Sequence, residues 1–353
     1  MTAGSAAGPP GGFSLAEMLV ALALVSAVLA AGLAATGQGL RLSLVQPDVA
    51  DLDQRLRVAA SVLRAALDRA GAGLPAGEQP GTLTQRWPAV YPQRRGSDGA
   101  DPPDGAFTDR LTIVSALPVG GAPLLSAGML AATSPIGFLL DPPCSPSDVR
   151  CGFRPGQLAA VDDRFGRVDV FRVASVESGV LGHTPLALSR AYAPADGARV
   201  VPIDVRHFRF DPVRRQVRTG SGGFTELPLL DDVVRFEVAY EGESSPPAVP
   251  RPPPGIATCL YDEHGARRLP ELGGAVGRRV ELPIGMLRDG PFCGDGVGRY
   301  DADLLRVRRV VIRLTVAGLA RGGTGGPRTG LDHLTASREV VVDVTPRNLQ
   351  AVP

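Results

Sequence analysis

Residues 11–40 read GGFSLAEMLVALALVSAVLAAGLAATGQGL, and this stretch decides how the chain is organised. From Met18 to Ala35 it has 18 residues without a charged side chain. Because a helix rises ~1.5 Å per residue, these residues span about 27 Å, close to the roughly 30 Å of a bilayer's hydrocarbon core. The sequence therefore predicts a transmembrane helix at about 18–40.

One charged residue, Glu17, lies at the start of this apolar segment. A carboxylate inside lipid costs a few kcal/mol and needs a partner, so Glu17 is a candidate functional residue. The plainer interpretation places Glu17 at the level of the lipid headgroups, where its carboxylate is solvated and has no role.

The residues around Glu17 favour the functional interpretation. Gly11-Gly12 is followed by Phe13-Ser14-Leu15-Ala16-Glu17 and then at once by the apolar run. This pattern resembles the N-terminus of type IV prepilins and of type II secretion pseudopilins. The resemblance implies that residues 1–12 are a leader, which prepilin peptidase cuts after Gly12, and that the new terminus at Phe13 is N-methylated. It also implies that Glu17 meets the α-amine of a neighbouring subunit during assembly.

Two features depart from this pattern or compete with it. Prepilin leaders usually carry Lys or Arg, whereas residues 1–12 have no charged side chain. The positive-inside rule therefore gives no support for the orientation of the helix. A rival interpretation is an ordinary signal peptide cut near Gly32-Leu33-Ala34, which would leave Glu17 unexplained.

The chain has four cysteines, Cys144, Cys151, Cys259 and Cys293, without a CxxC spacing. An even number without metal-ligand spacing favours two disulfides, and hence an oxidising compartment, over a metal site. Pairing between neighbours in the sequence would join Cys144 to Cys151 and Cys259 to Cys293. All three connectivities of four cysteines remain open at this point.

After the membrane segment, residues 48–70 show a helical pattern. Apolar residues recur every three or four positions and form one stripe that should pack on a globular body. The stripe consists of Leu52, Leu56, Ala59, Leu63, Ala66 and Ala70. Pro47 should interrupt the helix before this stripe, and Gly71 and Gly73 should end it. The helical arm is thus predicted over residues 13–71.

The remainder, residues 72–353, is predicted to be a β-rich domain with a loop insertion at about 241–298. Its strand signals alternate apolar and polar residues, which is typical of an antiparallel sheet with one solvated face. They lie at Arg110–Ala116, Val168–Ser175, Val200–Phe210, Val233–Tyr240, Arg309–Val316 and Glu339–Thr345. The predicted fold class is α+β, a long N-terminal helix packed on an antiparallel sheet.

Three runs in this domain also resemble one subfamily, the large W-type minor pilins and J-type minor pseudopilins. They are Leu229–Phe236 leading to Tyr240, Tyr300–Leu305, and Thr345–Leu349. The end of the helical arm, Ala66–Gly71, is similar to the LRxAG ending of the larger minor pilins.

Composition and motifs favour a non-enzymatic protein. The formal charge is +1, too small to favour nucleic acid as a partner. No GxSxG, Walker A or HExxH motif occurs, so we expect no catalytic site, no cofactor and no small-molecule substrate. Asp295, Asp301 and Asp303 lack the spacing of a calcium loop, and a helix cap at Asp301 or Asp303 is the better interpretation.

The resemblance and the size of the domain together imply a minor pilin or pseudopilin that helps to initiate or cap a type IV pilus. Its expected partners are other minor and major pilins, prepilin peptidase and the inner membrane, with the body in the periplasm and later at the cell surface. Two alternatives remain, a type II secretion minor pseudopilin and a secreted, membrane-anchored enzyme or binding module.

Overall fold

The structure is a computed structural model of the 353-residue chain. It describes residues 14–73, 88–95, 101–102, 104–116, 123–139, 153–163, 168–177, 179–184, 187–221, 225–247, 251–252, 254–255, 257–274, 278–294, 299–318 and 336–349. The side chains of residues 37–48, 168, 318 and 336 are not among them. The chain divides into two compact units, residues 1–53 with 318–336, and residues 54–317 with 337–353.

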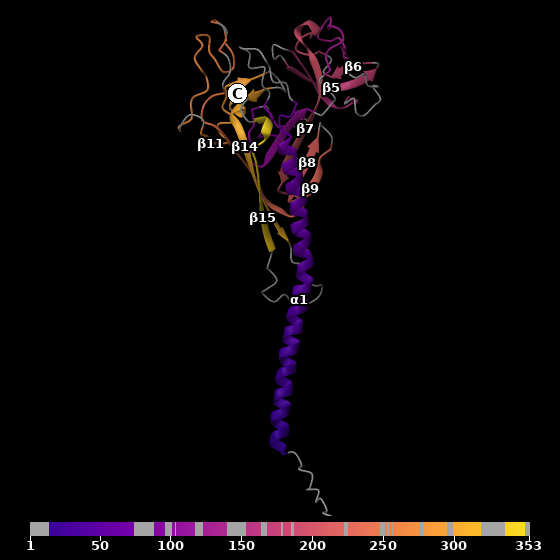
Figure 1. Ribbon diagram of the computed structural model, residues 1–353, viewed down its shortest axis with the longest axis vertical. Coiled ribbons are helices and arrows are strands. Elements are labelled where there is room, and N and C mark those ends of the chain that lie inside the picture. The colour runs from indigo at the N-terminus through magenta and orange to yellow at the C-terminus, as the bar shows by residue number, and fades with distance from the viewer. Residues whose placement is uncertain are drawn as a thin grey trace, which may run out of the picture. The chain divides into compact units, whose positions relative to one another are not determined.

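The first unit contains most of helix α1 (Leu15–Asp68), the long helix in Figure 1. Its segment Leu15–Thr36 is 22 residues long with a mean hydropathy of 2.5, and none of it is buried. Among the described residues, one helix is therefore long and apolar enough to span a membrane. The prediction that Pro47 interrupts the helix is wrong, because α1 is continuous across it. A proline removes one backbone hydrogen bond, and the neighbouring turns keep theirs.

The second unit begins with the last turns of α1. The whole predicted apolar stripe is buried, as is Leu67 beside it. The helix ends at Asp68, and the chain then turns through Gly71 and Gly73, whose φ angles of 75° and 65° lie in the left-handed region that favours glycine. The amide of Gly71 donates to the carbonyl of Val114 at 2.9 Å, which ties the helix end to strand β2.

A nine-stranded antiparallel sheet follows, in the order β1-β2-β7-β4-β5-β6-β3, with β8 and β9 added beside β7. Its strands are β1 (Val90–Tyr91), β2 (Arg110–Ala116), β3 (Ile136–Gly137), β4 (Leu158–Asp162), β5 (Val168–Glu177), β6 (Val180–Thr184), β7 (Arg199–Asp211), β8 (Gln216–Ser221) and β9 (Leu227–Leu230). Strand β7 is the longest of them and pairs with three neighbours, so it holds the two halves of the sheet together.

A four-stranded sheet, in the order β11-β10-β14-β15, completes the core of this unit. It consists of β10 (Val233–Glu243), β11 (Arg279–Leu282), β14 (Val307–Gly318) and β15 (Ala336–Val344). The inward residues Val310, Ile312 and Leu314 are fully buried, as the predicted amphipathic strand requires. On the other face, Arg309 bonds Glu241 and Asp343, a charge ladder that crosses three strands.

All six segments predicted as strands are strands, and the body is an antiparallel β structure as expected. The insertion at 241–298 is less loop-like than predicted. It contributes β11 to the four-stranded sheet, and β12 (Phe292–Cys293) pairs with β13 (Tyr300–Asp301).

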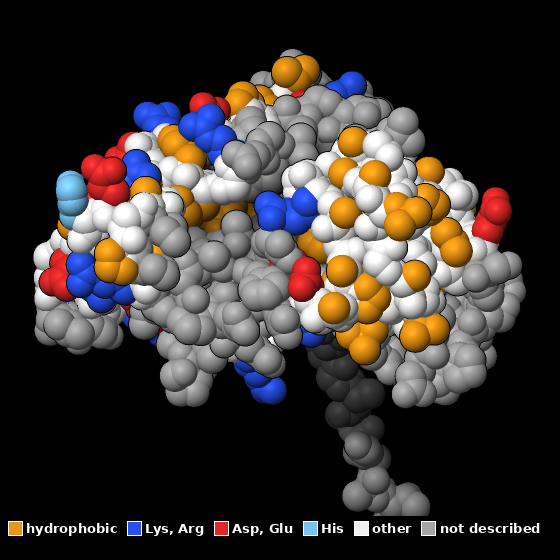
Figure 2. All heavy atoms as spheres, turned by 90° about the horizontal axis from the view of Figure 1, so that it is seen from above, with side chains coloured by type: hydrophobic (Ala, Val, Ile, Leu, Met, Phe, Trp, Pro, Cys, Tyr) orange, Lys and Arg blue, Asp and Glu red, His pale blue; other side chains and the backbone are white. Residues whose placement is uncertain are grey.

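The part of the nine-stranded sheet that carries β3 to β6 has its own apolar core, which includes Ile136, Phe171 and Leu181. Residues 111–140 contain no charged side chain. Two of their leucines are strongly exposed, Leu130 at 98% and Leu139 at 60%. Figure 2 shows hydrophobic side chains scattered over one side of the drawn face, with few charged side chains among them. The described residues of the segment 111–140 therefore expose apolar side chains and no charged ones.

Candidate functional site

Glu17 lies in the first turn of α1, where it forms a capping box with Ser14. The Ser14 amide donates to Glu17 Oε2 at 3.0 Å, and the Glu17 amide donates to Ser14 Oγ at 3.2 Å. These bonds satisfy two of the amides that a helix start leaves without intrahelical partners. The S-x-x-E spacing from Ser14 to Glu17 is the sequence signal of such a box.

The capping box orients the carboxylate of Glu17 toward the beginning of the helix. Only Oε2 is used in the box, and no described residue forms a hydrogen bond with Oε1. The positive end of the helix dipole favours an anion at this position. One carboxylate oxygen is thus held in place while the other can accept a bond from a cation. Gly12 and Phe13, the predicted processing residues, lie outside the described residues.

The apolar segment after Glu17 satisfies its own polar side chains. Ser26 Oγ donates to the Leu22 carbonyl and Thr36 Oγ1 to the Gly32 carbonyl, each at 2.7 Å. Such bonds to the carbonyl four residues earlier remove the cost of placing a hydroxyl in lipid. Apart from these side chains and Glu17, residues 15–36 are Ala, Gly, Leu, Met and Val.

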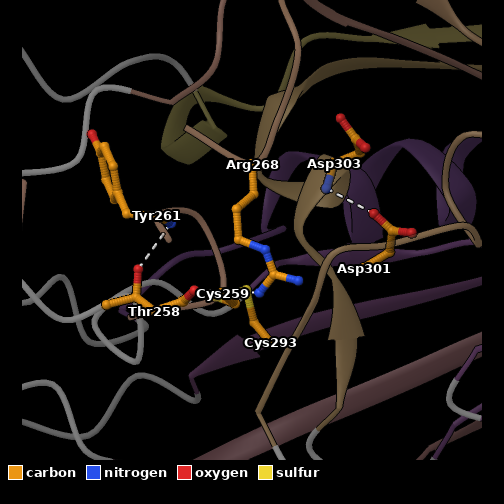
Figure 3. The surroundings of a disulfide bond; sticks show 7 residues. All are labelled: Thr258, Cys259, Tyr261, Arg268, Cys293, Asp301 and Asp303. Atoms are coloured by element: carbon orange, nitrogen blue, oxygen red, sulfur yellow. Dashed lines mark hydrogen bonds between the residues drawn. A yellow bond between two sulfur atoms is a disulfide. The ribbon is translucent and has the colours of Figure 1, made fainter. Parts of the chain in front are cut away.

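Of the predicted disulfide residues, the structure joins Cys259 to Cys293. This pair is the one that pairing between sequence neighbours predicts for the insertion. The guanidinium of Arg268 lies beside the bridge (Figure 3), and its Nη1 donates to the carbonyl of Thr258 at 3.4 Å. Cys144 and Cys151 lie outside the described residues.

Asp301 caps a short 3-10 helix, η5 (Ala302–Arg306), as the sequence suggested. Its carboxylate accepts from the amide of Asp303 at 2.9 Å and from the amide of Gly290 at 2.7 Å (Figure 3 shows the first). Burial raises the pKa of Asp301 to about 6, although these two amides lower it. Both carboxylate oxygens have backbone donors, which supports the cap over a calcium ligand. Asp295 lies outside the described residues.

Arg306 is a buried residue that holds parts of the body together, and the sequence analysis did not predict it. Its side chain is fully buried, and its Nε lies 2.7 Å from Asp303 Oδ1. Its guanidinium also donates to the carbonyl of Ser244 at 3.0 Å and to the carbonyl of Pro270. Arg306 therefore links the end of β10 to the insertion. An arginine gives no sequence signal of burial, because arginines are usually exposed.

A second buried charge cluster surrounds Glu226. Its carboxylate accepts from Arg209 Nε at 2.8 Å and from Arg94 Nη1 at 3.2 Å, and it lies 3.1 Å from Nε2 of the fully buried His207. Burial raises the pKa of Glu226, but the hydrogen bonds and charge of Arg209 outweigh the effect of burial and lower the pKa to about 2. Gly220 lies against the imidazole, where an added Cβ would come within 2.5 Å of Cε1.

Within the described ranges, no group of three or more His, Cys, Asp or Glu side chains is arranged to hold a metal ion. Glu17, at the start of an exposed apolar helix, has one carboxylate oxygen, Oε1, to which no described residue forms a hydrogen bond. Comparison of the chain with protein-family models, with curated proteins and with solved structures returned no match.

Proposed function

We propose that the protein is a minor pilin, a non-enzymatic subunit that helps to initiate or cap assembly of a type IV pilus. One observation carries the proposal. Glu17 sits five residues after Gly12, at the first turn of an exposed apolar helix, with one carboxylate oxygen fixed by Ser14 and the other unbonded by described residues. The prepilin-like sequence around it adds the processing step.

The chemistry of assembly follows from the cost of charge in lipid. Cleavage after Gly12 would free an α-ammonium group at Phe13, close in sequence to the capping box. A carboxylate and an ammonium group that pair in the apolar zone remove much of the cost that each carries alone. The unbonded Oε1 of Glu17 is the atom available to an ammonium group from a neighbouring subunit.

The size of the body supports a place at an end of the filament. Most of the chain follows the membrane segment, and a body this large is hard to repeat along a tightly packed fibre. The sequence resemblance to W-type minor pilins and J-type minor pseudopilins points the same way.

The test is the N-terminus of the mature protein. Mass spectrometry of the chain purified from membranes should find Phe13 first, with a methylated amine. The same chain with Gly12→Val should keep residues 1–12, because the peptidase requires the glycine in the prepilin pattern. A mature chain that starts near Ala35 or Thr36 would instead identify a cleaved signal peptide and overturn the proposal.

A type II secretion pseudopilin would share the same helix, processing and charge pairing, so it is the second candidate. A deletion strain separates the two. Loss of twitching with normal secretion favours the pilus, and loss of secretion with normal twitching favours the pseudopilus. A secreted, anchored enzyme or binding module remains the alternative if the mature N-terminus is not Phe13.

A further inference from the structure

The outer edge of the four-stranded sheet lies next to the last turns of α1. Strand β15 ends the sheet, and no other described strand pairs with its second edge. A strand in this position presents a row of unpaired backbone donors and acceptors, which is a template for another strand. Proteins commonly protect such edges with proline or charged side chains. Strand β15, with the sequence ASREVVVDV, has charged residues on both sides of Val340–Val342 but none within these three residues.

A groove of about 420 Å³ runs between this edge and the helix. On the strand it is lined by Val340, Val341 and Val342. Consecutive strand residues point to opposite faces, so a groove that touches three in a row follows the edge of the strand. The helix side consists of Arg57, Ala60, Ser61, Arg64, Ala65 and Asp68. The small side chains in the middle of this set leave room for an additional backbone.

The helix side of the groove carries more positive than negative charge. Arg57 and Arg64 are exposed, and neither forms an ion pair with a described residue. Asp68 is the only acid among the lining residues. A strand that enters the groove therefore gains most if it directs carboxylates toward the two arginines.

The occupant is not a second copy paired about a twofold axis. Helix α1 and β15 run in the same direction in this unit. The charge of Arg64 lowers the pKa of Asp343, and further along both segments Asn348 Nδ2 donates to the Ala70 carbonyl at 3.3 Å. Antiparallel pairing of two β15 edges would turn the second copy end for end. The two chains would then enter their bodies from opposite ends, whereas anchors in one membrane require the same end.

We propose that this groove binds an extended strand of a different subunit, which pairs with β15 and places acidic side chains at Arg57 and Arg64. The inference rests on the proposed assembly function for the source of the strand. The binding itself is a property of the groove, so it can be measured without any assembly.

The measurement uses the full chain in detergent micelles and a fluorescent synthetic peptide, Thr-Val-Glu-Val-Thr-Val-Glu-Val. Fluorescence anisotropy should saturate with the parent peptide. A peptide with the same side chains but N-methylated at alternate residues should bind at least about tenfold more weakly, because it loses backbone donors. Replacing both glutamates by lysine should also abolish saturation.

Variants of the protein locate the site. Arg57→Gln and Arg64→Gln should each weaken binding about two- to fivefold, whereas Arg69→Gln, the same charge change outside the groove, should leave it unchanged. Val341→Lys should prevent binding, because lysine protects an edge. Three results would each overturn the proposal. The N-methylated peptide could bind as tightly as the parent peptide, or Arg64→Gln and Arg69→Gln could have equal effects. The third is no saturation up to about 1 mM, which corresponds to a binding free energy near −4 kcal/mol. A mature N-terminus other than Phe13 would remove the assembly function and leave this result standing.

Discussion

At the scale of single residues, Ser14 and Glu17 are joined by two hydrogen bonds, but only Glu17 carries a charge. Capping and charge pairing are therefore separable by substitution. Glutamine is also accepted at the N3 position of a capping box, so Glu17→Gln keeps the cap and removes the charge. Ser14→Ala removes the serine half of the cap, at about 1 kcal/mol, and keeps the charge.

If charge pairing recruits this subunit, Glu17→Gln should insert and be cleaved normally but fail to co-purify with other pilins. Ser14→Ala should assemble at close to the wild-type level, and Glu17→Val should insert well and fail to assemble. Co-purification and counts of surface filaments measure these outcomes. Wild-type assembly of Glu17→Gln would mean that Glu17 acts through its cap alone.

A second residue-scale prediction concerns His207 and pH. Burial lowers the pKa of His207, although the neighbouring Glu226 raises it. An unfolded histidine therefore binds a proton at a pH where the folded one does not, and stability should fall as the pH drops below about 6.5. Glu226, with a pKa of about 2, stays ionised throughout this window.

The contribution of His207 alone should thus lower the thermal midpoint of the protein in detergent at pH 5 relative to pH 7, while the raised pKa values of the buried Asp162, Asp301 and Asp303 favour the folded state at the lower pH. His207→Gln can still donate a bond to Glu226 but does not titrate, so it should raise the midpoint at pH 5 relative to that at pH 7. Asp301 acts in the opposite sense. Its pKa of about 6 lies above the unfolded value, so the stability it contributes is greatest at low pH and is lost as the pH rises through 6. An unchanged pH dependence in His207→Gln would exclude the histidine as the cause.

At the scale of elements, the insertion is held to the sheet by contacts of two kinds. The Cys259–Cys293 disulfide closes a separation of 34 residues, and Arg306 binds the carbonyls of Ser244 and Pro270. Arg306→Met would remove a donor from the Pro270 carbonyl and the ion-pair partner of the buried Asp303, whereas the Ser244 carbonyl keeps its bond from the amide of Leu272. The loss of a buried ion-pair partner costs about 3–5 kcal/mol.

Urea unfolding should show this loss for Arg306→Met. Arg235→Met removes the partner of an exposed pair, Arg235 with Glu237, and should cost less than about 1 kcal/mol. If both variants lose the same stability, the buried arginine is not what holds the insertion.

The elements also show what the sequence could predict. Long strands with clear alternation, such as β7 and β14, were found because one face must be buried and the other solvated. Strands such as β6 (VLGHT) and β8 (QVRTGS) are short and mixed in character, and only their neighbours make them strands. Strand β11 was missed inside a loop-rich insertion for the same reason. At the site, Glu17 stood out as a charge in an apolar run, whereas the burial of Arg306 and His207 depends on tertiary contacts.

At the scale of the whole molecule, the second compact unit includes the last turns of α1, whose apolar stripe was expected to pack on the body. The second unit begins at Gln54, and the buried residues Leu56, Leu63 and Leu67 belong to the core of that unit. The sequence-based division, with a globular domain from residue 72, would remove them. The loss of one buried leucine side chain costs about 2–5 kcal/mol of stability. The loss of three is therefore comparable with the whole free energy of unfolding of a typical domain, about 5–15 kcal/mol.

Two truncated chains, both exported with a cleavable signal peptide, test this boundary. A chain that starts at Val49 keeps the whole buried stripe and lacks the apolar segment, so it should be soluble, monomeric and cooperative in thermal unfolding. A chain that starts at Ala72 should aggregate or be degraded, because the surface that the stripe covers becomes exposed to water. Size-exclusion chromatography and circular dichroism distinguish these results. A folded, soluble chain from Ala72 would show that the end of α1 is an accessory of the body, and that the sheets close their core without it.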